Sequence, residues 1–460
     1  MMLFNSSQFL IDTLRQRRQK LGYLIDFPAI LWSGRESSRN FPANIYPFRA
    51  SSHFLYFAGF PLENAAIRLY EGGLELFMDD SPEGSALWHI EIPPRNQIAE
   101  MIGADFSYPL SELSVHLEDA ATILVQNPIT ANEQRQLLNC PLRSAKEPKG
   151  IDLELTQAII YLRLTHDGQA LQELRQAAEV SIQAHKRGMK ATKTAQLEAE
   201  IRGAMEGVII SHNMTCSYNS IVTIQGEVLH NQHYHNRLQS GDLLLADVGA
   251  ETVLGWAADI TRTWPVSGRF SPTQRDIYQV VLKAHDSCID SIKPGIEYQE
   301  IHRIAAIIIA EGLVDLGILK GNPEDLVEQD AHALFFPHGI GHLLGLDVHD
   351  MEDLGDLAGY EYGRVRSQRF GWCFLRLNRP LKPRMLVTIE PGFYQVPAIL
   401  NDPKNREQYQ NIVNWERLEQ FADVRGIRIE DDVLVTETGT EVLTQSLPTS
   451  IQDIEDLVKN

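Results

Sequence analysis

Four short apolar segments of this chain each contain an acidic residue at a position where a buried strand would place it. The acids are Asp247 in LLLADVG, Asp259 in WAADITRT, Glu390 in LVTIEPG and Glu430 in GIRIEDDV. A carboxylate is costly to bury unless a partner compensates its charge. The fold must therefore give each strand its own cation or bring the four carboxylates to a shared one.

The first two segments are separated by residues 249–255, a turn-forming stretch with a glycine at each end. We expect the segments to pair as a hairpin that places Asp247 and Asp259 side by side. Two carboxylates that close cannot both stay ionised without a cation. Arg262 could supply that cation in a simple salt bridge.

Four independent salt bridges are harder to reconcile with the sequence, because no run of lysines or arginines near the four acids balances their charge. A pair of divalent cations accounts for all four acids together, with some carboxylates bridging the ions and others terminal. One imidazole would complete such a site. Oxygen-rich ligation with a single imidazole favours manganese, with cobalt or zinc as alternatives, over a structural zinc bound by thiolates.

Candidate imidazoles lie in residues 335–350, which read FFPHGIGHLLGLDVHD. Glycines alternate there with histidines, and glycine lets the main chain adopt unusual angles and approach a ligand closely. Taken alone, this segment could equally be a surface loop with scattered histidines. The four acids elsewhere in the chain favour a shaped turn that presents an imidazole to a metal. The histidines are His338, His342 and His349.

Composition limits the possible partners. The chain has 41 basic and 61 acidic residues, and its formal charge of −20 repels nucleic acid. Aliphatic runs such as Ala305–Ala310 are too short to cross a membrane, and the N-terminal residues do not resemble a signal peptide. Four widely spaced cysteines without a CxxC pair suit a reducing compartment. We therefore expect a cytoplasmic enzyme with neither a nucleic-acid nor a membrane partner.

The 460 residues are enough for two or three domains. Residues 1–150 alternate between strand and helix patterns, which predicts a smaller α/β domain. A polar stretch with proline and glycine around residues 143–151 is the expected linker, and residues 151–460 form the second domain. Three histidines of the first domain have no carboxylate or cysteine at ligand spacing, so we expect them to be structural or at the edge of a substrate site. They are His53, His89 and His116.

The chain resembles the proline-specific metallopeptidases of the pita-bread fold, namely aminopeptidase P and prolidase. The motifs that carry the resemblance are LLLADVG…ADITRTWPVSGRF, FFPHGIGHLLGLDVHD, LVTIEPGFY and GIRIEDDVLVTETG, within about residues 165–444. They occur in the family's order, although the Asp247–Asp259 interval is one residue longer than usual. The resemblance implies an α+β fold in which helices back a curved, mostly antiparallel sheet. It also implies two metal ions bound by Asp247, Asp259, His342, Glu390 and Glu430.

The resemblance also assigns catalytic roles to residues around the metals. His230 matches a substrate-side histidine, while His338 and His349 match the imidazoles that hold the substrate carbonyl and the tetrahedral intermediate. Tyr218 matches a tyrosine near the substrate. Glu390 would move a proton from water to the leaving nitrogen.

The implied activity is hydrolysis of Xaa–Pro bonds in peptides with proline second, and we expect a dipeptidase like prolidase. Arginines matching Arg376 and Arg428 would grip the product-side carboxylate, since a guanidinium binds a carboxylate in bidentate fashion. Arg428 could equally be a partner of a metal-bound carboxylate. Residues 46–60 resemble aminopeptidase P at least as well, which leaves an Xaa-Pro aminopeptidase acting on longer peptides as the alternative.

A more distant alternative is a catalytically inactive pita-bread module used for protein binding, since fold alone does not fix function. The complete ligand set argues against it, and also against creatinase-like cleavage without metal. Methionine aminopeptidase lacks the N-terminal domain. We expect a homo-oligomer, either a dimer or a tetramer, with oligomer contacts in the N-terminal domain.

Overall fold

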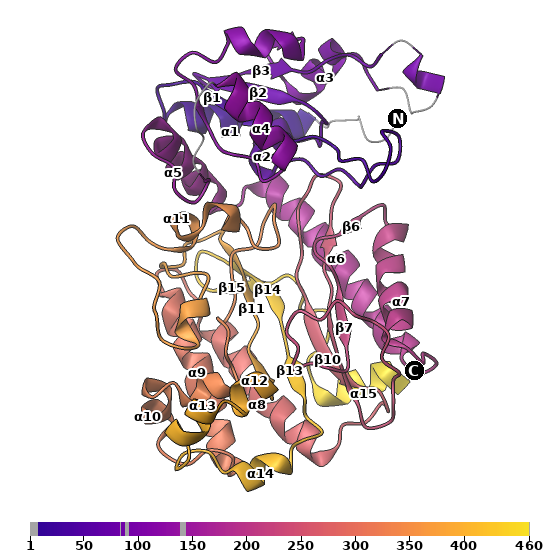
Figure 1. Ribbon diagram of the computed structural model, residues 1–460, viewed down its shortest axis with the longest axis vertical. Coiled ribbons are helices and arrows are strands. Elements are labelled where there is room, and N and C mark those ends of the chain that lie inside the picture. The colour runs from indigo at the N-terminus through magenta and orange to yellow at the C-terminus, as the bar shows by residue number, and fades with distance from the viewer. Residues whose placement is uncertain (1–7, 83, 88–91, 139–143, 460) are drawn as a thin grey trace. The chain divides into compact units, whose positions relative to one another are not determined.

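The computed structural model describes residues 8–82, 84–87, 92–138 and 144–459, so His89 and Cys140 lie outside the described residues. The chain divides into two compact units: Met1–Gln169 with Met351–Ala358, and Ala170–Asp350 with Gly359–Asn460 (Figure 1). We expected the division at residue 150, but the first unit extends to Gln169 and so includes helix α5 (Ile151–Arg163). No helix in the described part of the chain is long and apolar enough to span a membrane.

The first unit is built on a five-stranded mixed sheet with strand order β4-β3-β2-β1-β5. Strand β2 is antiparallel to β1 and β3, whereas β4 and β5 pair in parallel with β3 and β1. This unit confirms the expected α/β character of the N-terminal region. Its strands are β1 (Ala29–Trp32), β2 (Ala66–Tyr70), β3 (Gly73–Phe77), β4 (Phe106–Tyr108) and β5 (Ala121–Thr122). Its other helices are α1 (Gln8–Gly22), α2 (Ser52–Ala58), α3 (Arg95–Ile102) and α4 (Pro128–Leu137).

A buried apolar cluster on this sheet includes Ile30, Trp32 and Phe77. Strands β2 and β3 form a hairpin whose turn is Glu71-Gly72. Both central residues of its turn have left-handed backbone angles, with φ of 50° at Glu71 and 82° at Gly72. Such turns match the twist of a two-stranded ribbon, which explains why this short sequence fixes the register.

The second unit contains long helices (Figure 1). They are α6 (Gly168–Ala191, which starts in the first unit), α7 (Glu198–Ser211), α8 (Pro272–Ser291) and α9 (Tyr298–Asp315). Helix α8 begins with a capping box, in which Ser271 and Gln274 each accept a hydrogen bond from the other's backbone N–H. In Figure 1 the strands of the unit lie between α7 and α9.

The second unit also contains shorter helices, namely α10 (Pro323–Glu328), α11 (Asp356–Gly359, which starts in the first unit), α12 (Pro397–Leu400), α13 (Pro403–Gln408), α14 (Trp415–Glu419) and α15 (Ile451–Lys459). Its short antiparallel sheets have strand orders β10-β8-β7, β11-β14-β15, β12-β13 and β6-β9. The strands are β6 (Thr215–Cys216), β7 (Ile221–Thr223), β8 (Leu243–Asp247), β9 (Ala250–Glu251), β10 (Thr261–Pro265), β11 (Leu386–Ile389), β12 (Gly392–Tyr394), β13 (Gly426–Arg428), β14 (Asp431–Val435) and β15 (Thr440–Val442). The combination of short antiparallel sheets and long helices agrees with the α+β fold class expected from the sequence.

Pairing of these strands brings the buried acids together. The predicted hairpin is present, with β8 antiparallel to β10 and Asp247 opposite Thr261. Glu430 differs from expectation, because it does not lie inside one continuous strand. It sits where the chain leaves β13, which pairs with β12, and enters β14, which pairs with β11. A bridge between Thr261 and Glu430 joins this switch point to β10.

Candidate metal centre and active site

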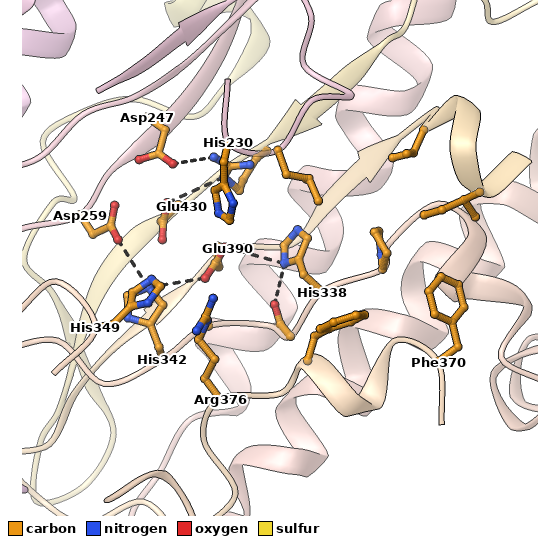
Figure 2. A pocket seen from close by; sticks show the side chains of 18 of the residues that line it. His230, Asp247, Asp259, His338, His342, His349, Phe370, Arg376, Glu390 and Glu430 are labelled. Atoms are coloured by element: carbon orange, nitrogen blue, oxygen red, sulfur yellow. Dashed lines mark hydrogen bonds and ion pairs between the residues drawn. The ribbon is translucent and has the colours of Figure 1, made fainter. Parts of the chain in front are cut away.

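The five side chains expected to bind metal line one cavity of about 550 Å³ in the second unit (Figure 2). A cavity of this volume suits a small ligand. The residues come from five separate places in the sequence: Asp247 ends β8, Asp259 precedes β10, His342 follows the 3₁₀ helix Ala331–Leu334, Glu390 follows β11, and Glu430 joins β13 to β14. The fold therefore converges all five on a shared space.

His342 lies among the carboxylates. Its Nε2 atom is 3.4 Å from Oδ2 of Asp259 and 3.6 Å from Oε1 of Glu390. One ligand atom from each of Asp259, His342 and Glu430 lies within 4.8 Å of the others. Groups this close can share one ion.

The hydrogen bond on the far side of the His342 ring fixes its tautomer. Nδ1 lies 2.9 Å from the backbone oxygen of Leu343. Because a carbonyl can only accept, Nδ1 carries the hydrogen and Nε2 presents its lone pair to the carboxylates. Metal-binding histidines commonly show this arrangement, in which one nitrogen donates to a carbonyl and the other binds the ion. The His342 ring is therefore oriented to bind a metal.

The buried carboxylates of this site have raised pKa values, which indicates that their negative charge needs a compensating cation. Burial, reinforced by neighbouring carboxylates, raises the pKa values of Asp259 and Glu430 well above their usual range. Burial also raises the pKa of Glu390 to about 7. At neutral pH, Asp259 and Glu430 would be protonated and Glu390 partly so if no cation balanced their charge, whereas divalent cations would hold all three ionised. The donor set, four carboxylates and one imidazole, fits hard or borderline divalent metals.

The contacts of Tyr218 also indicate that this site needs a cation. Its hydroxyl oxygen lies 2.5 Å from Oδ1 of Asp247 and 2.6 Å from Oδ1 of Asp259. A phenol has one hydrogen to donate, so one of the two carboxyls must itself be protonated for both contacts to be hydrogen bonds. Sequence comparison suggested that Tyr218 faces the substrate. It instead bonds to two candidate ligands and is not among the side chains that line the cavity.

Arg428 is held by side chains of the protein. Its guanidinium donates to Asp247 at 2.6 Å, to Thr261 at 3.0 Å and to the Tyr394 hydroxyl at 3.1 Å, and the residue is only 4% exposed. Of the two alternatives left open by the sequence, this geometry favours a partner of a candidate metal ligand over a clamp for the substrate carboxylate.

Arg262 does not pair with Asp247 or Asp259, as the simple salt-bridge interpretation required. Its Nη2 atom lies 2.8 Å from Oδ1 of Asp431, and the side chain is completely buried. Asp431 is the first residue of β14, and its carboxylate bonds to Arg262 and Thr444 and does not line the cavity. The salt bridge is therefore real, but its acid is the residue after Glu430.

The remaining residues expected at the site line the same cavity, namely His230, His338, His349 and Arg376 (Figure 2). His349 packs against His342, with 4.0 Å between ring centroids. Both nitrogens of His338 have protein partners, since Nδ1 donates to the Gly339 oxygen at 2.8 Å and Nε2 lies 2.8 Å from the Tyr394 hydroxyl. Burial lowers the pKa of His338 to about 3, so the ring is neutral.

Two residues of the network escaped prediction from the sequence. Thr261 donates to Oε2 of Glu430 at 2.6 Å and accepts from Arg428. Its position two residues after Asp259, on the same face of an extended segment, was a usable indication. Tyr394 connects His338 to Arg428, and nothing in its local sequence indicates that role.

Residue 341, next to His342, must be a glycine because neighbouring atoms leave no room for a side chain. A Cβ atom there would lie 2.2 Å from the Thr388 backbone oxygen and 2.4 Å from the Tyr298 hydroxyl. The same strand segment fixes His342, whose N–H donates to Oγ1 of Thr388. We expect Gly341→Ala to lower the free energy of unfolding by about 2–3 kcal/mol. Chemical denaturation should show this loss, whereas Gly203→Ala, in an open position on α7, should not.

Comparison with known proteins identifies the class that this fold and site define. Residues 172–437 match metallopeptidase family M24, and residues 14–125 match the N-terminal domain of aminopeptidase P. Escherichia coli Xaa-Pro aminopeptidase is 31% identical over 454 residues, covering 94% of this chain and 93% of the relative. Human Xaa-Pro dipeptidase is 30% identical over 438 residues, covering 93% and 87%.

Solved structures agree with these sequence matches. Pseudomonas aeruginosa aminopeptidase PepP superposes with a TM-score of 0.80 at 29% identity, covering 98% of both chains. Escherichia coli aminopeptidase P with the inhibitor Pro-Leu gives 0.79 at 29% identity, covering 99% of both. The chain belongs to metallopeptidase family M24, among its Xaa-Pro peptidases, and has the pita-bread fold. The resemblance inferred from the motifs is thereby confirmed.

Proposed function

We propose that this chain is an Xaa-Pro dipeptidase with two divalent metal ions, manganese being the expected ion and cobalt or zinc the alternatives. The observation that carries the proposal is the convergence of Asp247, Asp259, His342, Glu390 and Glu430 on one cavity that also contains Arg376. Support for the metals comes from the orientation of His342 and from the buried carboxylates, whose charge Arg428 alone cannot balance. Bound ions would supply an activated water and would stabilise negative charge on the substrate carbonyl.

The chain's own residues move the proton. Glu390 lines the cavity and lies 3.6 Å from Nε2 of His342, so its carboxylate can take a proton from the attacking water. As the bond between the carbonyl carbon and the proline nitrogen breaks, Glu390 returns that proton to the nitrogen. In the proposed reaction His349 and His338 donate to the carbonyl oxygen and the tetrahedral intermediate, and His230 lies on the substrate side of the same cavity. His338 must exchange one of its two present hydrogen bonds before it can contact a substrate.

Arg376 supplies the preference for dipeptides. Its guanidinium lines the cavity, and the backbone beside it is fixed because the Leu375 oxygen accepts bonds from Arg366 and Tyr360, both at 2.8 Å. A guanidinium can bind the C-terminal carboxylate of an Xaa-Pro dipeptide in bidentate fashion. A longer peptide has an uncharged amide at that position. Binding energy would therefore favour the dipeptide.

An Xaa-Pro aminopeptidase acting on longer peptides is the second candidate. Its specific support is the similarity to proteins named Xaa-Pro aminopeptidase in Escherichia coli and Haemophilus influenzae, together with the aminopeptidase structures. The two candidates share the metal site and differ only in how the cavity treats the residue after proline.

Cleavage of Ala-Pro and of Ala-Pro-Ala, with manganese supplied, separates the two candidates. We expect kcat/KM to be higher for the dipeptide, and Arg376→Gln to lower it about 10–100-fold for Ala-Pro while changing Ala-Pro-Ala less than threefold. Arg369→Gln is the matched control, because Arg369 pairs with Asp330 and does not line the cavity. Cleavage of the tripeptide alone would exclude the dipeptidase, and cleavage of neither peptide would exclude both candidates.

Location and assembly belong to the same proposal. We place the enzyme in the cytoplasm as a homo-oligomer. Free thiols at Cys216, Cys288 and Cys373 support a reducing compartment. Sedimentation of the purified chain would give its oligomeric state.

A further inference from the structure

Two of the segments that carry candidate metal ligands are cross-linked to each other inside the second unit. Asp259 is followed by Arg262 on β10, and Glu430 is followed by Asp432 on β14. The Arg262 side chain bonds to the backbone of Glu430, and the Asp432 side chain bonds to the backbone of Asp259. Each segment therefore holds the main chain at the other segment's ligand.

The guanidinium of Arg262 is completely buried, and all five of its N–H groups are engaged. Nη1 donates to the backbone oxygens of Glu430 at 2.7 Å and of Thr261 at 3.1 Å. The other N–H groups donate to Oδ1 of Asp431 at 2.8 Å and to the backbone oxygens of Leu447 at 2.9 Å and Pro448 at 3.2 Å. Because a buried donor that loses its acceptor is costly, this arrangement fixes the Glu430 carbonyl.

Arg262 acts on Glu430 through the backbone. Its ion-pair partner is Asp431, whose carboxylate balances the charge of the guanidinium at 2.8 Å. Arg428 differs in this respect, because its guanidinium bonds directly to the carboxylate of Asp247. The contribution of Arg262 to the site is therefore one of geometry.

Asp432 holds the backbone of the other ligand. The residue is 1% exposed, and its Oδ1 and Oδ2 atoms lie 3.2 Å and 3.4 Å from the Asp259 nitrogen. A carboxyl group keeps an oxygen that can accept this bond whether it is ionised or protonated. The contact therefore does not depend on the charge of Asp432.

The two contacts flank a direct pairing of Thr261 with Glu430. The Glu430 N–H donates to the Thr261 oxygen at 3.0 Å, and the Thr261 hydroxyl donates to Oε2 of Glu430 at 2.6 Å. The same segments set the distance between Asp259 and Glu430, which face His342 with one ligand atom from each of the three within 4.8 Å of the others. A change in this spacing would separate groups that can share one ion.

We propose that Arg262 and Asp432 are positioning residues of the metal centre: they hold the main chain at Glu430 and Asp259 so that the two carboxylates keep the spacing at which they share an ion. This inference rests on the metal site of the proposed function. Neither side chain lines the cavity, so both act only through the ligands.

Two substitutions of Asp432 separate the backbone contact from the buried charge. Both asparagine and alanine remove the charge, but only asparagine keeps an oxygen for the Asp259 N–H. We expect Asp432→Ala to weaken manganese binding about 10–100-fold and Asp432→Asn to leave it within threefold of wild type. The matched control is Asp152→Ala, which removes a carboxylate that accepts from the Thr122 N–H at 2.8 Å in the first unit and should not change manganese affinity.

Arg262→Lys tests the other contact. Lysine keeps the positive charge beside Asp431 but has three N–H groups for five acceptors. We expect manganese affinity to fall about tenfold. In the double variant with Asp432→Ala the two losses should combine to less than their product, because either substitution alone releases the same spacing. If Arg262→Lys does not fold, the two Asp432 variants decide the question by themselves.

Hydrogen exchange of the metal-free chain provides a readout that depends on neither metal nor catalysis. Backbone amides of residues 257–261 should exchange several-fold faster in Asp432→Ala than in Asp432→Asn. Equal exchange or equal manganese affinity in these two variants, or losses that multiply in the double variant, would overturn the proposal. If the wild-type chain binds no manganese, the proposed function fails, while the exchange comparison still decides whether Asp432 holds the backbone of Asp259.

Discussion

Asp259→Asn is expected to abolish hydrolysis and metal-dependent stabilisation together. Asp259 lies 3.4 Å from Nε2 of His342 and within 4.8 Å of Glu430, so its loss removes a group that an ion there would share. We expect turnover to fall about 1,000-fold or more, equivalent to about 4 kcal/mol of transition-state stabilisation. Calorimetric unfolding with and without manganese, beside the activity assay, would measure both effects.

The direction in which Asp259→Asn changes the stability of the metal-free chain distinguishes a metal ligand from an ordinary buried acid. In the wild-type chain, burial and Asp247 disfavour the ionised form of Asp259. Asparagine removes that penalty, so the metal-free variant should be as stable as wild type or more stable by roughly 1 kcal/mol. Manganese at about 100 times its dissociation constant should stabilise wild type by about 2.7 kcal/mol and the variant far less. Asp242→Asn, in the turn before β8, should respond to manganese like wild type. Full turnover in Asp259→Asn would refute the ligand assignment.

Arg428→Met should have the second large effect. This substitution removes the guanidinium that donates to Asp247, Thr261 and Tyr394, and leaves buried carboxylates without their nearest cationic side chain. We expect the free energy of unfolding to fall by about 3 kcal/mol. Metal affinity should fall about 10–100-fold, because Asp247 loses the bond that orients it. Denaturation and manganese titration would measure these two quantities.

The same variant distinguishes the two roles considered for Arg428. If the guanidinium gripped the substrate carboxylate instead, Arg428→Met would raise KM for Ala-Pro while leaving metal affinity unchanged. Arg18→Met is the matched control, since Arg18 is also buried but bonds to the backbone oxygens of Ile102 and Gly103 in the first unit. It should destabilise the chain without altering manganese binding.

Strands and turns that depend on a single short segment could be predicted from the sequence. Asp247 and Glu390 lie at the ends of apolar runs that form β8 and β11, and the glycines of residues 249–255 mark the turn between β8 and β10. In that turn β9 pairs with β6, and the Thr252 N–H donates to the Trp256 oxygen. In each case one short segment carries enough information to fix its own conformation.

Features that depend on pairing between distant segments were not predictable. Glu430 appears in the sequence as the middle of one strand, but β13 and β14 join different partners on either side of it. The role of Tyr394 depends on β12 pairing with β13, which brings its hydroxyl to Arg428. Likewise, we expected the polar stretch at residues 143–151 to be the linker between the two domains, but α5, which follows it, belongs to the first unit.

The number of manganese ions bound per chain, measured at equilibrium in the solution that hydrolyses Ala-Pro, tests the central claim most directly. Five converging ligands and the buried carboxylates predict two ions per wild-type chain, with hydrolysis rising as they bind. Asp259→Asn should bind fewer ions and be inactive. Hydrolysis at full rate by a chain that binds no metal would contradict the account.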